Sequence, residues 1–154
     1  MRLFPQRQRP GKVAKRVTER VSRETQGVIF SMNIDAALKE SMTIAGALGA
    51  ALVDYDSGMA LGMIGGGEWL NLEIAAAGNT EVVRAKLRVM ASLALNDGIE
   101  DILITLHRQY HLIRLLESSR GNQTLFLYLV LDRERANLAL ARHYLKRIES
   151  DLLV

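Results

Sequence analysis

The chain has 154 residues, of which 49% are hydrophobic and 24% charged, values typical of one soluble globular domain. It contains no cysteine, which excludes disulfides and thiolate chemistry and favours a cytoplasmic location. No apolar run approaches the roughly 18 residues expected of a membrane span.

The positive charge is concentrated at the start of the chain. Residues 1–24 carry eight Lys/Arg and two Glu, a balance of +6, whereas the remainder carries twelve basic and fifteen acidic side chains, a balance of −3. This distribution argues against a nucleic-acid-binding face on the folded part. We expect residues 1–30 to form a disordered basic tail and residues 31–154 to form the domain.

The tail contains a short apolar pattern. Val13, Val17 and Val21 recur every four residues and would form a thin stripe on a helix. Because β-branched residues are poor helix formers, we favour a solvated tail. The alternative is an anchor for an anionic membrane or for nucleic acid, since clustered Lys/Arg near such surfaces each contribute about 1 kcal/mol.

The first half of the domain predicts a short helix, a hairpin and a long helix. The short helix covers about Asn33 to Thr43, with Asn33 able to cap it. Ser31 is an alternative cap for this helix. A strand of small residues, Ala47 to Asp54, turns into a second strand, Met59 to Ile64. The long helix covers about Trp69 to Leu95.

Two short stretches bear on how the long helix continues and ends. The stretch Gly78-Asn79-Thr80 interrupts its apolar pattern and predicts a kink or a break. Asn96-Asp97-Gly98 then predicts its end, with Gly98 suited to the left-handed conformation that follows many helices.

The stretch from Ile99 to Asp132 holds three apolar runs separated by HRQ and ESSRGN, which predicts three antiparallel strands. The first of these strands is Glu100 to His107. The last run, Leu125 to Leu131, is apolar without a break, which is typical of a strand covered on both faces.

A final helix is predicted from Arg133 or Glu134 to about Leu152, capped by Asp132. The order is α-β-β-α-β-β-β-α. In a five-stranded antiparallel sheet of this order, two helices can cover one face and the third helix the other. This is a layered α+β sandwich.

Motifs that could bind a metal are incomplete. His107 and His111 are four residues apart, but the spacing straddles a predicted hairpin and no carboxylate or cysteine completes a site. Asp54, Asp56 and Gly58 begin like a calcium loop, but its twelfth position is Gly65, where a bidentate Glu is required.

Motifs for phosphate binding and catalysis are also incomplete. No Gly-Lys-Ser/Thr follows the glycines between positions 62 and 67, and no Gly-x-Ser-x-Gly elbow presents a nucleophile. We therefore expect no enzyme activity, no metal and no cofactor. Gly46, Gly49 and Gly62 leave one alternative open, a sensory module with a small-molecule pocket beside these glycines. The single tryptophan, Trp69, favours a core position, with a partner anchor as the alternative.

The predicted strand Glu100–His107 raises a question of assembly. If it lies at a sheet edge, both its faces are apolar, and a long apolar edge promotes aggregation unless it is paired. Burying each large aliphatic side chain is worth about 1.5–3 kcal/mol. A symmetric dimer would cover them. The apolar side chains are Ile102, Ile104 and Leu106 on one face and Ile99 and Leu103 on the other.

Four stretches carry a resemblance to a known family. They are a glycine-led strand and turn, GALGAALVDYDSGMALG; a helix opening, WLNLEIAAAGNTEVVRAK; a hairpin, EDILITLHRQYHLIRLLE; and a last strand and helix, FLYLVLDRERANLALARHYLKRIE. In the last of these, Asn137, Leu138 and Arg142 form an Asn-Leu-x-x-x-Arg arrangement. Together, over about residues 33–152, they resemble the Roadblock/dynein light-chain family in its bacterial branch.

The resemblance implies a profilin-like sandwich that dimerises by joining third strands edge to edge while the central helices pack together. The interface would then consist of Ile99, Glu100, Ile102, Leu103, Ile104 and Leu106, with Leu87 and Met90 from the long helix.

The resemblance also implies a partner. Bacterial members of the family are similar to activators or docking platforms of small Ras-like GTPases and act without a catalytic residue of their own, while others are structural adaptors in larger complexes. Trp69, Arg84 and Arg88 are the expected partner surface of this chain.

Overall fold

The computed structural model describes residues 32–117 and 124–152, so the predicted tail at residues 1–30 lies outside it. The elements, in chain order, are α2 (Ile34–Ser41), β1 (Ala47–Asp54), β2 (Met59–Gly65), α3 (Leu72–Ser92), β3 (Asp101–Thr105), β4 (Gln109–Leu115), β5 (Leu125–Asp132) and α4 (Leu138–Asp151). The expected order of elements and the α+β fold class are confirmed.

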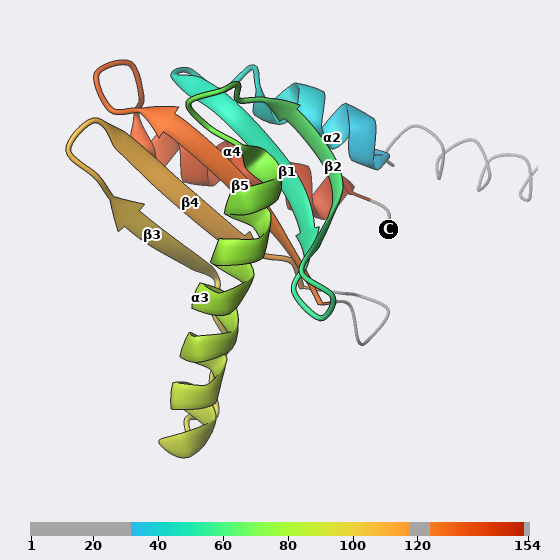
Figure 1. Ribbon diagram of the computed structural model, residues 1–154, viewed down its shortest axis with the longest axis vertical. Coiled ribbons are helices and arrows are strands. Elements are labelled where there is room, and N and C mark those ends of the chain that lie inside the picture. Colours follow the sequence, from blue (N-terminus) through green and yellow to red (C-terminus); the bar gives the residue numbers. More distant parts are fainter. Residues whose placement is uncertain (1–31, 118–123, 153–154) are drawn as a thin grey trace, which may run out of the picture. The chain divides into compact units, whose positions relative to one another are not determined.

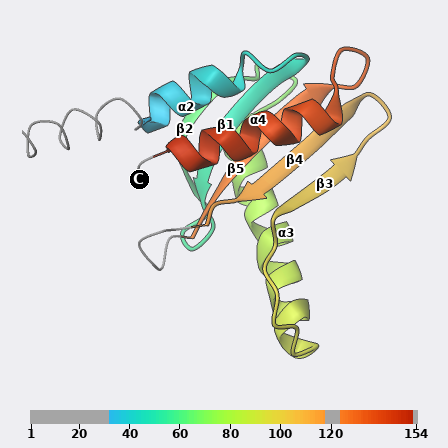
Figure 2. The same cartoon turned by 180° about the vertical axis from the view of Figure 1, so that it is seen from behind.

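The five strands form one antiparallel sheet in the order β2-β1-β5-β4-β3. Helices α2 and α4 cover one face and α3 covers the other (Figures 1 and 2). The last strand of the chain, β5, is therefore the central strand of the sheet.

The position of β5 explains its uninterrupted apolar sequence. Leu127, Leu129 and Leu131 pack under α2 and α4, whereas the alternate residues Phe126, Tyr128 and Val130 pack under α3. All six side chains are buried. Since successive side chains of a strand point to opposite faces, a strand between two helical layers needs apolar residues at every position.

The N-terminal caps of two helices differ from the sequence prediction. Helix α3 begins at Leu72 rather than Trp69, with the Asn71 side chain accepting hydrogen bonds from the amides of Glu73 and Ile74. Helix α4 begins at Leu138, capped by Asn137, and Asp132 instead caps the preceding turn. In both cases the Asn side chain directly before the helix is the residue that caps it.

The predicted break in α3 does not occur. The helix is continuous from Leu72 to Ser92. Thr80, which is buried, donates its hydroxyl hydrogen bond to the carbonyl of Ala76 at 2.8 Å, so its polar group is satisfied within the helix.

The end of α3 was also predicted at the wrong residue. The amide of Leu95 donates to the carbonyl of Met90, and that of Ala94 to Ala91, which together form a Schellman motif. The left-handed residue of this motif is Ala94, with φ of 52°. Gly98 does not adopt a positive φ.

None of the helices in the described ranges has the length and apolar character that crossing a membrane requires.

Replacing Ala94 with Gly should stabilise the domain. An L-residue in the left-handed region costs about 1–2 kcal/mol, which glycine avoids. Part of this gain is lost because glycine is more flexible in the unfolded chain. We expect a gain of about 0.5–1 kcal/mol in the free energy of unfolding and a rise of about 2–5 °C in Tm, measured by thermal unfolding. Gly98→Ala is the control, because a Cβ there meets no atom within 4 Å. A lower Tm for Ala94→Gly would contradict the role of this residue.

Candidate protein-interaction site

Strand β3 lies at an edge of the sheet, as predicted for Glu100–His107. Among the described strands it pairs only with β4. The strand itself is shorter than expected, Asp101–Thr105, so Glu100, Leu106 and His107 flank it. The predicted face was wrong for one side chain. Ile99 packs with Ile102 and Ile104 on the α3 side of the sheet, because it precedes the strand and does not follow the alternation of the strand's side chains.

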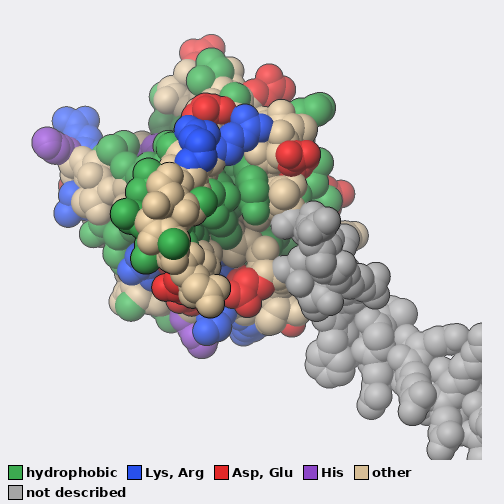
Figure 3. Space-filling view, turned by 90° about the horizontal axis from the view of Figure 1, so that it is seen from below, with side chains coloured by type: hydrophobic (Ala, Val, Ile, Leu, Met, Phe, Trp, Pro, Cys, Tyr) green, Lys and Arg blue, Asp and Glu red, His purple; other side chains and the backbone are tan. Residues whose placement is uncertain are grey.

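The second half of α3 projects beyond the sheet (Figure 1). Figure 3, seen from the direction in which the helix projects, shows hydrophobic side chains gathered around it, with charged side chains at the margins. Val82, Val89 and Leu93 are 38%, 48% and 63% exposed, and Leu95 beyond the helix is 51% exposed. A row of this kind on one helix is typical of a face that another protein covers.

A groove of about 660 Å³ separates this part of α3 from the start of β3. Val82, Met90 and Leu95 provide apolar walls, and Ile99 and Ile102 continue them on the strand side. Lys86, Asp97, Glu100 and Asp101 also line the groove. The unpaired strand edge, the groove and the exposed row of α3 are adjacent, and we call them together the β3 seam.

The expected interface residues differ in their solvent exposure within a single chain. Ile102, Leu103 and Ile104 are half-buried, while Glu100 and Leu106 are exposed. Leu87 is half-buried against the sheet, and Met90 is only 8% exposed. The outward residues Val82, Val89 and Leu93 were missed because the sequence pattern of α3 fits two apolar faces, and only the packed structure shows which one faces the sheet.

Charged side chains tie the seam to α4. The guanidinium of Arg142 binds the Asp101 carboxylate through two hydrogen bonds, of 2.9 and 3.0 Å. Arg114, which is buried, pairs with Glu149. Glu100 lies 3.6 Å from Arg114 and is 69% exposed, so it is loosely held at the start of the edge strand.

The expected partner surface contains an exposed tryptophan. Trp69 is 58% exposed, so the expectation of a core position was wrong. Ile74, one turn into α3, is 72% exposed. A shallower groove of about 330 Å³ lies beside them, with His111 and Tyr128 at its base. Two large apolar side chains beside a groove are the features expected of a protein-docking surface.

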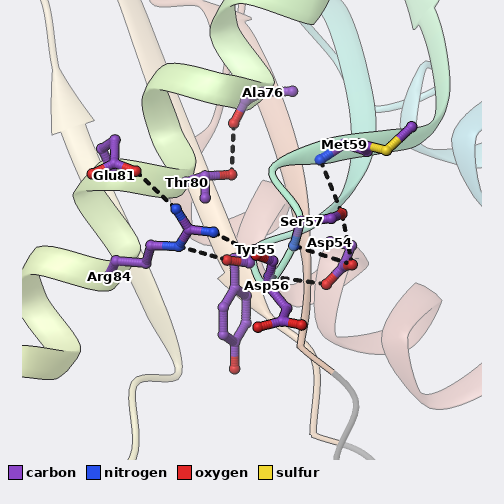
Figure 4. A network of polar contacts seen from close by, with 9 residues as sticks. All are labelled: Asp54, Tyr55, Asp56, Ser57, Met59, Ala76, Thr80, Glu81 and Arg84. Atoms are coloured by element: carbon purple, nitrogen blue, oxygen red, sulfur yellow. Dashed lines mark hydrogen bonds and ion pairs between the residues drawn. The ribbon is translucent and has the colours of Figure 1, made fainter.

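Arg84 has a structural role. Its Nε donates to the carbonyl of Tyr55 at 2.8 Å and another guanidinium nitrogen donates to the carbonyl of Asp56 (Figure 4). It also pairs with Glu81 at 2.9 Å. The side chain thus fastens the middle of α3 to the turn between β1 and β2. Arg88, one turn further along, is exposed.

The carboxylate of Asp54 organises that same turn. It accepts hydrogen bonds from the hydroxyls of Thr124 and Ser57, at 2.6 and 2.8 Å, and from the amide of Asp56 at 3.0 Å. The Thr124 bond, followed by the Ser57 bond, lowers the pKa of Asp54 to about 2. Asp56 and Ser57 belong to the turn of the β1–β2 hairpin, whereas Thr124 lies directly before β5, so the carboxylate connects the two segments.

The histidines do not form a metal site. The Nδ1 atom of His111 lies 2.8 Å from the Tyr128 hydroxyl, and its Nε2 atom lies 2.9 Å from Gln109. Burial lowers the pKa of His111 and raises that of Tyr128. Within the described part of the chain, no three His, Asp or Glu side chains are placed to hold a metal ion.

The three glycines of the sensory-module alternative lie close against neighbouring atoms. A Cβ at Gly46, Gly49 or Gly62 would lie 2.8–3.0 Å from a neighbouring atom. The neighbours are the Asp132–Ala136 turn, the backbone of Gly66 and the Leu38 and Ile34 side chains, respectively. The glycines therefore permit close packing.

The geometry just described belongs to a known fold. The chain has the Roadblock/LC7 fold: five antiparallel strands with two helices on one face and a long helix on the other. It is similar to the Roadblock/LC7 domain from Streptomyces avermitilis, with a TM-score of 0.64 and 12% identity over 77% of this chain and 92% of that one.

Two further solved structures are similar. MglB from Myxococcus xanthus has a TM-score of 0.64 and 16% identity, covering 75% of this chain and 81% of that one. An MglB with a tetrameric arrangement has a TM-score of 0.58 and 21% identity, covering 73% and 79%. No family model and no curated protein matches the sequence. The likeness therefore lies in the fold.

Replacing Asp54 with Asn should destabilise the domain in a pH-dependent way. The carboxylate, with its pKa lowered from 3.8 to about 2, stabilises the folded state above pH 4, and this contribution is lost as the pH falls toward 2. We expect a loss of about 1 kcal/mol at pH 7, measured by urea unfolding.

The control for this variant is Asp56→Asn, in the same turn, which should have little effect. An equal loss for Asp54→Asn at pH 7 and at pH 2.5 would contradict the assignment.

Proposed function

We propose that the chain is a homodimeric, non-enzymatic regulator or docking platform of a small Ras-like GTPase, acting in the cytoplasm. The observation that carries the proposal is the β3 seam, an unpaired apolar strand edge beside an exposed apolar helix. The Roadblock/LC7 fold supports it, because the family resemblance implies both self-association through this edge and a GTPase partner.

The charges along the β3 edge favour antiparallel pairing with a second copy. Glu100 is exposed at the beginning of the strand, and His107 and Arg108 are exposed just beyond its end. When two copies pair antiparallel about a two-fold axis, the beginning of one strand lies near the end of the other. Glu100 of each copy would then approach the basic end of its partner.

The outer face of α3 fits a second helix. Gly78, Val82, Ala85 and Val89 recur at intervals of four, three and four residues, the spacing of a helix–helix contact. A Cβ on Gly78 would meet no atom within 4 Å, so this position is open. Small residues allow a neighbouring helix to approach closely, and the groove beside β3 would receive side chains of the second copy.

The N-terminal end of α3 and the residues just before it provide a surface for the GTPase. Trp69, which precedes the helix, and Ile74, in its first turn, are exposed and lie at the opposite end of the helix from Leu93. Tryptophan is enriched among residues that dominate protein interfaces. In this arrangement the chain supplies a shaped surface and no reacting group, so any acceleration of GTP hydrolysis would come from reorganising the GTPase's own site.

Charged substitutions on the exposed row should disrupt the β3 seam. We expect the double variant Val89→Lys, Leu93→Lys to stay folded and to have a lower mass than the wild type, because both side chains are exposed in one chain and two lysines would face two others across the seam. Light scattering after size exclusion measures the mass. Leu140→Lys, at a leucine on α4 that is 44% exposed, should leave the mass unchanged. If the double variant kept the mass of the wild type, the α3 contact would be wrong.

Binding of the GTPase can be tested separately. The full chain is titrated against each small Ras-like GTPase of its own cell, with GTP hydrolysis followed in parallel. We expect one of them to bind, and Trp69→Ala to weaken that binding by about tenfold or more. Leu140→Ala is the control. Binding without faster hydrolysis would indicate a docking platform, and no binding by any GTPase would refute the proposed partner.

A further inference from the structure

The sheet has a second edge, β2, which is less protected than β3. Among the described strands, β2 pairs only with β1. The run from Met59 to Gly67 contains no charged residue and no proline. Edge strands of monomeric proteins usually carry such residues, which hinder pairing with other chains. The only protective feature here is the irregularity opposite Leu52 and Val53, where Leu61 is an extra residue.

The outward side chains of β2 are large and apolar. Met59, Leu61 and Met63 are 67%, 48% and 42% exposed. The residues between them are half-buried. Gly62 is held against α2, since a Cβ there would lie 2.8 Å from a Leu38 methyl group. In the described part of the chain, helix α2 thus packs against one face of the strand, while the edge and much of the three large side chains stay exposed.

We infer that β2 is a second self-association interface, in which the β2 strands of two copies pair antiparallel. The absence of charge favours a second copy as the occupant. Self-pairing of an uncharged strand brings no like charges together, whereas a charged partner strand would find no counter-charge on Met59–Gly67. Methionine side chains are flexible and pack well against irregular apolar surfaces.

The length of β2 specifies the pairing. When all seven residues pair about a two-fold axis, the axis passes through the central residue, Gly62. Leu61 of one copy then lies opposite Met63 of the other. This contact is at the opposite edge of the sheet from the β3 seam and does not depend on it. If both contacts form, each sheet continues into a neighbour on both sides, and the assembly extends beyond two chains.

Cysteine cross-linking tests the register. The chain has no cysteine, so Leu61→Cys and Met63→Cys each place one thiol on the full-length protein. Directly opposed residues of antiparallel strands are close enough for a disulfide. After oxidation of an equal mixture, we expect the mixed disulfide to exceed the two same-variant disulfides together. Leu140→Cys, mixed with either variant, should cross-link no more than by random collision. A random distribution among the three products would overturn the inference.

Mass measurement tests the interface without relying on the register. The wild type should exceed a dimer as its concentration rises, whereas Leu61→Lys, Met63→Lys should stop at a dimer formed by the β3 seam. The Val89→Lys, Leu93→Lys variant should form a dimer through β2, and combining all four substitutions should give a monomer. Circular dichroism confirms that each variant is folded. A Leu61→Lys, Met63→Lys variant with the same mass as the wild type at every concentration would overturn the β2 interface, whereas failure of the α3 variant alone would bear only on the proposed β3 seam.

Discussion

The central position of β5 is the constraint on which the rest of the domain depends. Its leucines, under α2 and α4, and its alternate aromatic and valine residues, under α3, belong to two separate cores. Burying each large apolar side chain contributes about 1.5–3 kcal/mol, so this one strand stabilises both layers. Because β1 and β4 occupy its two sides, the outer strands β2 and β3 are left as edges.

The exposed apolar residues follow from the same arrangement. Helix α3 has 21 residues, longer than the strands it crosses, so its last turns project past the sheet. Its outward residues, among them Val89 and Leu93, therefore stay exposed in a single chain. The Arg84 bonds to the β1–β2 turn hold the helix in this direction. The projecting helix is thus a fixed feature of the domain, and the surface it presents is determined before any partner arrives.

Sequence reasoning predicted most of the fold and less of the site. The apolar run Leu125–Leu131 was sufficient to predict a strand covered on both faces, and the apolar strand after Gly98 was correctly expected at an edge. Cap positions were predicted less accurately. Several Asn and Asp side chains compete near a helix end, and the turn before the helix decides which of them caps it, as with Asp132 and Asn137.

The outward face of α3 could not be assigned from the sequence. Leu87 and Val89 are equally apolar, and only the approach of the sheet makes one half-buried and the other exposed. Trp69 was misplaced for the same reason: its size favours burial, but it lies before the helix cap Asn71 and outside the sheet. The sequence did not indicate that Ala94 ends the helix, because alanine is normally unsuited to the left-handed conformation that it adopts there.

The order of the strands also bears on how the chain folds during its synthesis. Asp54 and Thr124, hydrogen-bonded at the junction of β1 and β5, are 70 positions apart. The strand that joins the two halves of the sheet is thus the last one to leave the ribosome. Until it does, the β1–β2 hairpin has no neighbour on its β5 side, and its small apolar residues remain in water. Since pairing of distant segments is slow, the two halves of the sheet join only after most of the chain has been made.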